Sequence, residues 1–207
     1  MKIGLIPMAA KPYHTGHHAL VQAAAAENDQ VILFVSTSDR TRKGEFPILG
    51  ENMKRVWMDL IEPALPGNVS PEYGGSPVAK VYGLLENANE EFQTLGQHPN
   101  TYVIYSDPTD TAQNYPEKNR QQYFGDIYND GNVLFGCEEG CPGMFERGVG
   151  TPDMSGTKMR QALQDNDLTT FTAGIPKGIN AEEVFNRLRQ SSVQELRKFV
   201  RSFLLVG

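Results

Sequence analysis

Short apolar stretches alternate along this chain with segments of helical spacing, and this alternation constrains the fold more than any other feature. Lys2–Ile6, Gln30–Val35 and Thr101–Tyr105 are apolar almost throughout, which is typical of strands covered on both faces. Gly16–Asn28 and Gly50–Glu62 carry apolar residues at helical intervals. The alternation predicts an α/β fold, with a Rossmann-like doubly wound parallel sheet.

The rest of the chain extends this pattern. Further strands are expected at Val69–Tyr73 and Asn132–Phe135, and further helices at Val78–Ala88, Ser155–Gln164, Ala181–Leu188 and Val193–Phe203. Pro116–Asp130 is polar and aromatic, and is a candidate lid with partial helix. The expected organisation is one domain over residues 1–165 and a C-terminal helical appendage over residues 166–207.

Composition excludes several classes of protein. The net charge of −6 argues against a nucleic-acid partner, since such domains are usually basic. There is no run of 18 apolar residues, and Met1-Lys2 leads straight into a strand, so we expect neither a membrane partner nor a signal peptide. We therefore expect a cytoplasmic protein. The oligomeric state stays open, with a homo-oligomer among the options.

The two cysteines, Cys137 and Cys141, lie in a stretch rich in Gly and Glu. A zinc site would need two more ligands, and a disulfide is not expected in a reducing cytosol. We therefore expect ordinary loop thiols.

A first candidate site follows the first strand. Residues 11–17 read KPYHTGH and lead into an Ala-rich helix. A helix start offers backbone N–H groups and the positive end of the dipole, which favour a phosphate. Gly16 allows close approach of the backbone, and His14 and His17 are near one helical turn apart. The pattern indicates a site for a nucleoside triphosphate.

A second candidate anion site lies at the start of the last predicted core helix, where residues 154–160 read MSGTKMR. Ser155 or Thr157 can cap this helix, with Asp153 as a further candidate. The hydroxyls and the side chains of Lys158 and Arg160 add to the N–H groups of the helix start. Arg160 suits multidentate phosphate contacts and stays charged at physiological pH.

Together the two motifs resemble the HxGH nucleotidyltransferase superfamily, whose signatures are HxGH and (I/V)S(S/G/T)TxxR. The second motif is more similar to the version in nicotinamide-mononucleotide and pantetheine-phosphate adenylyltransferases than to the RTxGISTT of cytidylyltransferases. The resemblance covers about residues 1–165, with about 140 residues between the motifs. The chain departs from the family at Met8, where a glycine is usual, and at Ala10, where an aromatic residue is frequent.

The resemblance implies direct nucleotidyl transfer and a set of site residues. His14 and His17 would donate to the α- and β-phosphates, Lys11 would neutralise the triphosphate, and Arg160 would hold the β- and γ-phosphates. These four are the expected catalytic residues. The remaining candidates are nucleotide contacts at Met8, Ala9, Gly16, Asp107, Met154, Ser155, Thr157 and Lys158, and substrate contacts at Thr37, Arg42 and Lys43.

The resemblance also implies Mg²⁺ held mainly by the phosphates, with ATP or CTP and a small phosphorylated acceptor such as nicotinamide mononucleotide as partners. One alternative is a cytidylyltransferase that forms a CDP-alcohol. Another is a nucleotide-binding regulatory module without turnover, which Met8 favours. A class I aminoacyl-tRNA synthetase is disfavoured because the chain is short and acidic and has no KMSKS run.

Three features have a plainer interpretation beside the functional one. Arg40, Arg42 and Lys43 form either a solvated loop or a loop that closes over phosphates. Asp107 contacts either a ribose hydroxyl or metal-bound water, or else starts a turn before Pro108. The helical spacing of Trp57 with Leu60 and Ile61 favours a place in the core.

Overall fold

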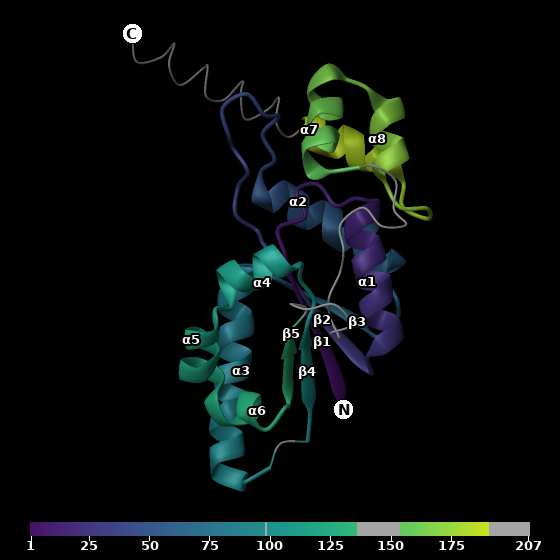
Figure 1. Cartoon of the computed structure of the whole chain (residues 1–207). Helices are drawn as coiled ribbons and strands as arrows, with labels where there is room; N and C mark the ends of the chain where they lie inside the picture. Colours follow the sequence, from purple (N-terminus) through teal and green to yellow (C-terminus); the bar gives the residue numbers. More distant parts are fainter. Residues whose placement is uncertain (98, 136–153, 191–207) are drawn as a thin grey trace. The chain divides into compact units, whose positions relative to one another are not determined.

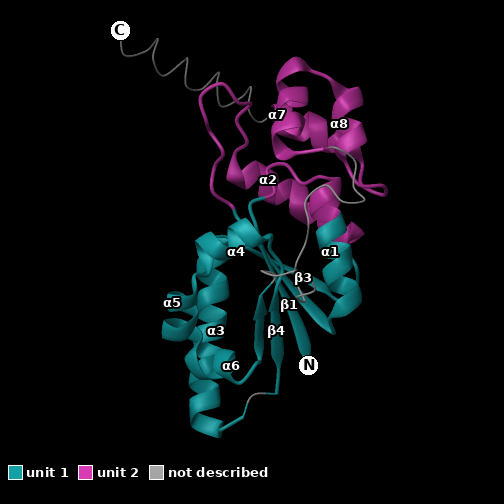
Figure 2. Cartoon of the chain, in the orientation of Figure 1, with its two compact units in different colours: residues 1–9, 19–36, 66–150 teal, residues 10–18, 37–65, 151–207 magenta. Residues whose placement is uncertain are grey.

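The computed structural model describes residues 1–97, 99–135 and 154–190 (Figure 1). The chain divides into two compact units, each made of several stretches (Figure 2). Unit 1 comprises Met1–Ala9, Ala19–Ser36 and Pro66–Gly150, and unit 2 comprises Ala10–His18, Thr37–Leu65 and Thr151–Gly207. The expected division at residue 165 stays a prediction.

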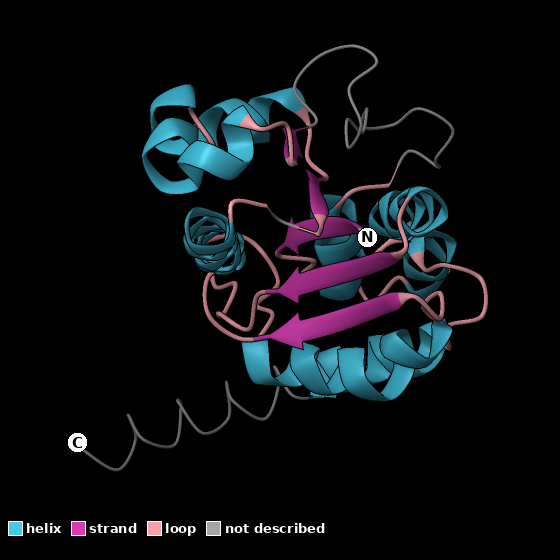
Figure 3. Ribbon diagram, turned by 90° about the horizontal axis from the view of Figure 1, so that it is seen from below, coloured by secondary structure: helices cyan, strands magenta, loops and turns pink. Residues whose placement is uncertain are grey.

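Unit 1 contains a sheet of five parallel strands in the order β3-β2-β1-β4-β5, visible side by side in Figure 3. The strands are β1 Lys2–Met8, β2 Gln30–Val35, β3 Val69–Tyr73, β4 Thr101–Ile104 and β5 Val133–Phe135. Gly4 pairs with Val31 on one side and with Val103 on the other, so β1 is central. The predicted α/β class with a parallel sheet is confirmed.

Helices cover both faces of this sheet (Figure 1). The part of α1 (Thr15–Glu27) that belongs to unit 1 lies on one side, where Val21 and Ala24 are buried. The long helix α3 (Pro77–Leu95) lies on the other. An apolar core lies on the face of the sheet that α3 covers. It is made of residues from strands and helices: Ile3, Leu5, Phe34, Val81, Leu85, Ala88, Tyr102, Ile104, Tyr115, Phe124, Ile127, Val133 and Phe135. The doubly wound arrangement is therefore also confirmed.

The strand order of unit 1 reverses between β1 and β4. In sheets of this kind, ligands bind beyond the carboxyl ends of the strands at such a switch point. The chain leaves β1 at Met8, and the segment that begins at Ala10 belongs to unit 2. In sequence, the HTGH motif thus comes after the central strand β1.

Unit 2 is helical. Its elements are α2 Gly50–Val56, a π-helical turn η1 Trp57–Ile61, a 3₁₀ turn η2 Glu62–Ala64, α7 Gly156–Asp165, α8 Leu168–Gly174 and a helix over residues 181–190. Phe171 of α8 and Phe185 pack edge to face, with ring centroids 5.2 Å apart. The side chains of Met154 and Met159 lie against Gly174, so α8 supports the start of α7.

Two helices were not foreseen, and both have clear capping signals. Asp107 Oδ1 accepts the N–H of Asp110 at 2.8 Å and starts α4 (Pro108–Asn114). Asp167 Oδ1 accepts the N–H of Thr170 at 3.0 Å and starts α8. Side-chain oxygens satisfy N–H groups of the first helical turn in this way. Of the two interpretations of Asp107, the turn is replaced by a helix start, and the contact with a ligand stays a prediction.

Residues 116–130 are helical, as expected in part. They form α5 (Glu117–Asn119), the π-helical η3 (Arg120–Phe124) and α6 (Gly125–Asn129). Phe124 and Ile127 are fully buried in the core of unit 1, so this segment packs as part of the fold and the lid interpretation is wrong. The expected helix over 193–203 and the two cysteines lie outside the described residues.

No helix in the described part of the chain is both long enough and apolar enough to cross a membrane.

Candidate active site

Three segments of unit 2 form the candidate site: the loop after Ala10, the loop that precedes α2, and the start of α7. The first begins with Ala10 in the left-handed region, at φ 43°, and contains a cis peptide between Lys11 and Pro12. Its side chains turn inward, because Lys11, Tyr13 and His14 are all buried. Burial of a lysine and a histidine is unusual unless their polar atoms have partners.

His14 is held in one tautomer by the backbone. The N–H of Gly16 donates to Nδ1 of His14 at 3.1 Å, so the proton of the neutral ring is on Nε2. Burial, and after it the positive charge of Arg160, lowers the pKa of His14 from 6.5 to about 4. At neutral pH the side chain is therefore an uncharged imidazole with an Nε2–H donor.

His17 belongs to a stack of rings. Its ring centroid is 3.8 Å from that of His14 and 5.7 Å from that of Tyr13, to which it lies nearly parallel at 12°. Tyr13 in turn packs at a steep angle on Trp57, with centroids 4.7 Å apart, and its hydroxyl lies 3.0 Å from Nδ1 of His18. Trp57 is fully buried, as predicted. The stack restricts both motif histidines to few orientations.

The second motif begins α7. Ser155 Oγ accepts the N–H of Lys158 at 3.2 Å, which confirms Ser155 as the N-cap. The other hydroxyl, Thr157 Oγ1, accepts from Arg160 Nη2 at 3.0 Å. Ser155, Thr157 and Lys158 are exposed, whereas Arg160 is only 5% exposed.

Arg160 joins the two motifs. Its Nη1 donates to the backbone carbonyl of Lys11 at 2.9 Å, across 149 residues of sequence. Gly156 makes this approach possible, since a Cβ there would lie 3.0 Å from Arg160 Nη1 and 3.7 Å from the Lys11 carbonyl oxygen. The structure thus brings together Lys11, His14, Gly16, His17 and the start of α7.

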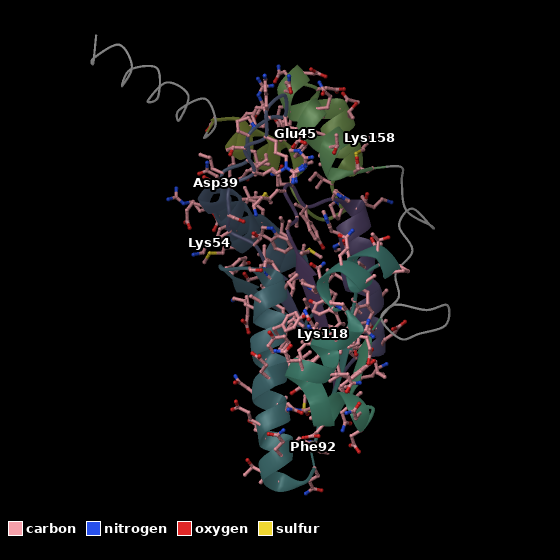
Figure 4. The ribbon with its side chains drawn as sticks, turned by 60° about the vertical axis from the view of Figure 1, so that its left-hand side comes forward. Asp39, Glu45, Lys54, Phe92, Lys118 and Lys158 are labelled. Carbon is pink, nitrogen blue, oxygen red and sulfur yellow. The ribbon has the colours of Figure 1, made fainter. Side chains whose placement is uncertain are left out.

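Glu45 lies between two arginines in this site. Arg40 donates to it through both Nε and Nη2, at 3.0 and 3.1 Å, and Arg160 Nε lies 2.9 Å from its Oε2. Figure 4 labels Glu45 and shows nitrogen atoms beside it. The pKa of Glu45 is lowered, chiefly by its hydrogen bond with Arg40. Burial lowers the pKa of Arg160, while the Glu45 carboxylate opposes that effect.

Lys11 adds a further positive charge. Burial lowers the pKa of its amine to about 8, with Asp39 opposing this effect and Arg40 adding to it. The amine is therefore still mostly charged at pH 7. Asp39 also fixes the neighbouring loop, because its Oδ1 accepts the N–H of Gly50 at 2.8 Å.

The three predicted substrate contacts, Thr37, Arg42 and Lys43, have different surroundings in the structure. Thr37 places its carbonyl against Gly50, where a Cβ would come within 1.7 Å of it. Arg42 is exposed, and its charge contributes to lowering the pKa of Arg160. Lys43 is exposed. The charge of Arg42 thus acts on Arg160 of the candidate site.

Three of the remaining predicted contacts, Met8, Asp107 and Met154, make structural contacts, and nucleotide contact by these three and by Ala9 stays a prediction. Met8 ends β1 and accepts the N–H of Ser36 at 3.1 Å, and Ala9 is exposed. Both belong to unit 1, as does Asp107, the N-cap of α4. Met154 packs against Gly174 in unit 2.

Glu45 and Tyr13 were not among the predicted site residues. Tyr13 lies within the first motif, and this position in the sequence could have indicated that it lies near His17. The signal for Glu45 was a single carboxylate directly after the basic residues Arg40, Arg42 and Lys43.

Formal charge is divided unevenly between the units. Unit 1 has 14 acidic and 5 basic residues, whereas unit 2 has 11 acidic and 14 basic residues. A net positive unit in a net negative chain favours an anionic ligand there. Within the described residues, no group of three or more His, Cys, Asp or Glu side chains is arranged to hold a metal ion.

Comparison with known families gives a partial match. A family model of the citrate lyase ligase C-terminal domain, which belongs to the nucleotidyltransferase-like superfamily, matches residues 3–48. These residues, less than a quarter of the chain, include HTGH and Glu45 but not the start of α7. No curated protein matches the chain. The match is to a family of enzymes and leaves the substrate open.

Proposed function

We propose that this protein is a nucleotidyltransferase that transfers AMP from ATP to a small phosphorylated acceptor such as nicotinamide mononucleotide, and releases pyrophosphate. One observation carries the proposal: Arg160 of the second motif donates to the carbonyl of Lys11, at the start of the first motif. Two sequence motifs that each favour a phosphate thus meet in one site. The match over residues 3–48 supports the same class of reaction.

The proposed reaction needs no nucleophile from the protein. A phosphate oxygen of the acceptor attacks the α-phosphorus of ATP in line, a new P–O bond forms, and the bond from that phosphorus to the β-phosphate oxygen breaks. Pyrophosphate leaves with the electron pair. Catalysis then consists of positioning the phosphates and stabilising charge on their oxygens.

The histidines supply donors for this charge. Neutral His14 would donate through Nε2–H to an oxygen of the α- or β-phosphate, because Gly16 occupies its other nitrogen. His17, whose ring is stacked on Tyr13 and tilted against His14, would donate to the same phosphates. Donors that are already in position need no reorganisation when the reaction occurs. They can therefore stabilise the charge that develops in the transition state.

The β- and γ-phosphates would be held by Arg160, Lys11 and the start of α7. A guanidinium binds phosphate with a planar fork, and a lysine adds a point charge. The positive end of the α7 dipole adds to both. Within the described residues no His, Cys, Asp or Glu cluster would hold a metal ion, so Mg²⁺ would be held mainly by the phosphates of the nucleotide and would supply further neutralisation of their charge.

Pyrophosphate release, measured with ATP and with CTP against a panel of phosphorylated acceptors, tests the proposal. We expect release with ATP and a nucleotide acceptor; preference for CTP would favour a cytidylyltransferase. Arg160→Lys should lower kcat/KM at least tenfold, because an ammonium lacks the fork. Arg187→Lys is the matched control, since Arg187 lies on the helix over 181–190 and pairs with Glu183 of that helix and with Asp59 of η1.

His17→Ala should lower turnover by a factor of roughly 100 or more while the circular dichroism spectrum stays unchanged. Normal turnover in this variant would remove the proposed role of His17. ATP binding without pyrophosphate release for any acceptor would favour a regulatory module instead.

A further inference from the structure

We propose that Glu45 is a displaceable stand-in for a ligand phosphate: its carboxylate occupies the anion position between Arg40 and Arg160, and it must leave when a triphosphate binds. This inference rests on the proposed function only in that the site accepts a polyphosphate. It assigns Glu45 a part in controlling access to the site.

The contacts of Glu45 are those of a bound anion. Arg40 holds both carboxylate oxygens through a two-bond fork, and Arg160 Nε lies 2.9 Å from one of them. Arginine forks bind carboxylate and phosphate oxygens with the same geometry. The face of Arg160 that would bind phosphate is therefore already occupied by an oxygen anion.

The two arginines need a counter-charge when no ligand is present. Arg160 is buried, and its charge would be costly there without an anion nearby. Its Nη1 and Nη2 are engaged by neutral acceptors, the Lys11 carbonyl and the Thr157 hydroxyl. Glu45 is the anion that lies on its remaining nitrogen, so it stabilises the ligand-free site.

The same carboxylate opposes a bound phosphate. Two negative charges about 4 Å apart repel each other, and they do so more strongly near a protein than in water. A phosphate on Arg160 would be at least that close to Glu45, given the 2.9 Å contact. Glu45 and the phosphate therefore exclude each other from this position.

Glu45 lies where it can move. It follows Gly44, at φ 82°, in the turn between Arg40 and Ile48, whose backbones pair with each other. Its side chain is 25% exposed, whereas that of Arg160 is 6% exposed. Ile48 anchors the base of the turn in the core. The carboxylate can thus turn toward solvent while Ile48 stays buried.

Calorimetry with inorganic tripolyphosphate tests the inference without requiring turnover. Glu45→Gln keeps the size of the side chain but removes its charge, and should bind tripolyphosphate about tenfold more tightly than the wild type. Glu51→Gln, on the exposed side of α2, is the matched control and should bind like the wild type. Equal or weaker binding by Glu45→Gln overturns the inference, because it would show that Glu45 does not compete for the site.

A second measurement uses the wild-type chain. NMR signals of the Nε–H groups of Arg40 and Arg160 should both shift on addition of tripolyphosphate, since Glu45 releases both. A shift of Arg160 alone, or no shift, would mean that Glu45 stays in place. If Glu45→Gln binds more tightly but no nucleotide yields pyrophosphate, the inference stands and the proposed function fails. If no polyphosphate binds at all, both fail.

Discussion

At His14, one backbone N–H decides which ring nitrogen is a donor. Gly16 donates to Nδ1, and burial keeps the ring neutral, with the pKa lowered from 6.5 to about 4. As pH falls through this range, the unfolded chain binds a proton that the folded chain does not. We therefore expect the free energy of unfolding to fall by roughly 3 kcal/mol from His14 alone between pH 7 and pH 4.

Urea denaturation at several pH values measures this effect, with His14→Gln as the reference because it has no group that titrates. The wild type should lose more stability than the variant as pH is lowered. A difference that stays constant from pH 7 to pH 4 would contradict the buried, neutral state of His14.

Gly16 leaves room for the His14 ring. A Cβ at this position would lie 3.0 Å from Cε1 and 3.2 Å from Nδ1 of His14, and the His17 ring limits where the imidazole can move. Gly16→Ala should keep the helix, because alanine favours it, but should lower kcat/KM for pyrophosphate release by roughly tenfold to a hundredfold. Wild-type turnover would mean that the ring position is not critical.

The capping and burial of several residues could be predicted because these properties depend on local sequence spacing. The capping of α7 by Ser155 and the burial of Trp57 followed from local spacing. The contact between Glu45 and Arg160 could not be predicted, because the two residues are distant in sequence and a charged loop residue is usually solvated. The Arg160 contact with a Lys11 carbonyl was equally hidden, since a backbone acceptor has no sequence signature.

The start of α2 depends on a close contact between two backbones. Gly50 lies against the carbonyl of Thr37, where a Cβ would come within 1.7 Å of the oxygen, and its N–H is bound by Asp39. Gly50→Ala should lower the free energy of unfolding by about 3 kcal/mol, because neither backbone can yield cheaply. Thermal denaturation measures the change, and a loss below about 1 kcal/mol would show that the loop can move aside.

Gly83 provides the opposite case within α3. A Cβ there meets nothing within 4 Å, and glycine costs helix stability relative to alanine. Gly83→Ala should therefore raise the free energy of unfolding by about 0.5–1 kcal/mol, measured by urea denaturation. An unchanged or lower value would indicate that α3 is not regular around this position.

Whole elements were predictable where pattern and propensity agree. β2 and β3 begin and end where the sequence predicts, because each is a short stretch of strand-forming residues bounded by turn residues. Asp107 followed by Pro108 predicts either a ligand contact or a turn, although Asp at the N-cap and Pro at the first helical position equally favour the helix that forms there. The stretch LTTFTAG has weak helix propensity, and α8 forms through the Asp167 cap and the burial of Phe171.

At the scale of the molecule, the basic residues gather in unit 2 although the whole chain is acidic. Long-range attraction of this kind is screened by salt. Tripolyphosphate binding should weaken several-fold between 50 mM and 500 mM salt, mostly through a slower association rate, as stopped-flow measurements can check. Affinity that does not depend on salt would mean that only the buried arginine contacts matter.

The long sequence separation of Lys11 and Arg160 has a consequence during synthesis. The ribosome adds about 5–20 residues per second, so the 149 positions between them take on the order of ten seconds to translate. A nascent chain therefore carries both motif histidines and Glu45 well before the arginine that joins them exists. The candidate site is therefore completed late in synthesis, and a chain that ends before Arg160 lacks the hydrogen bond that joins the two motifs.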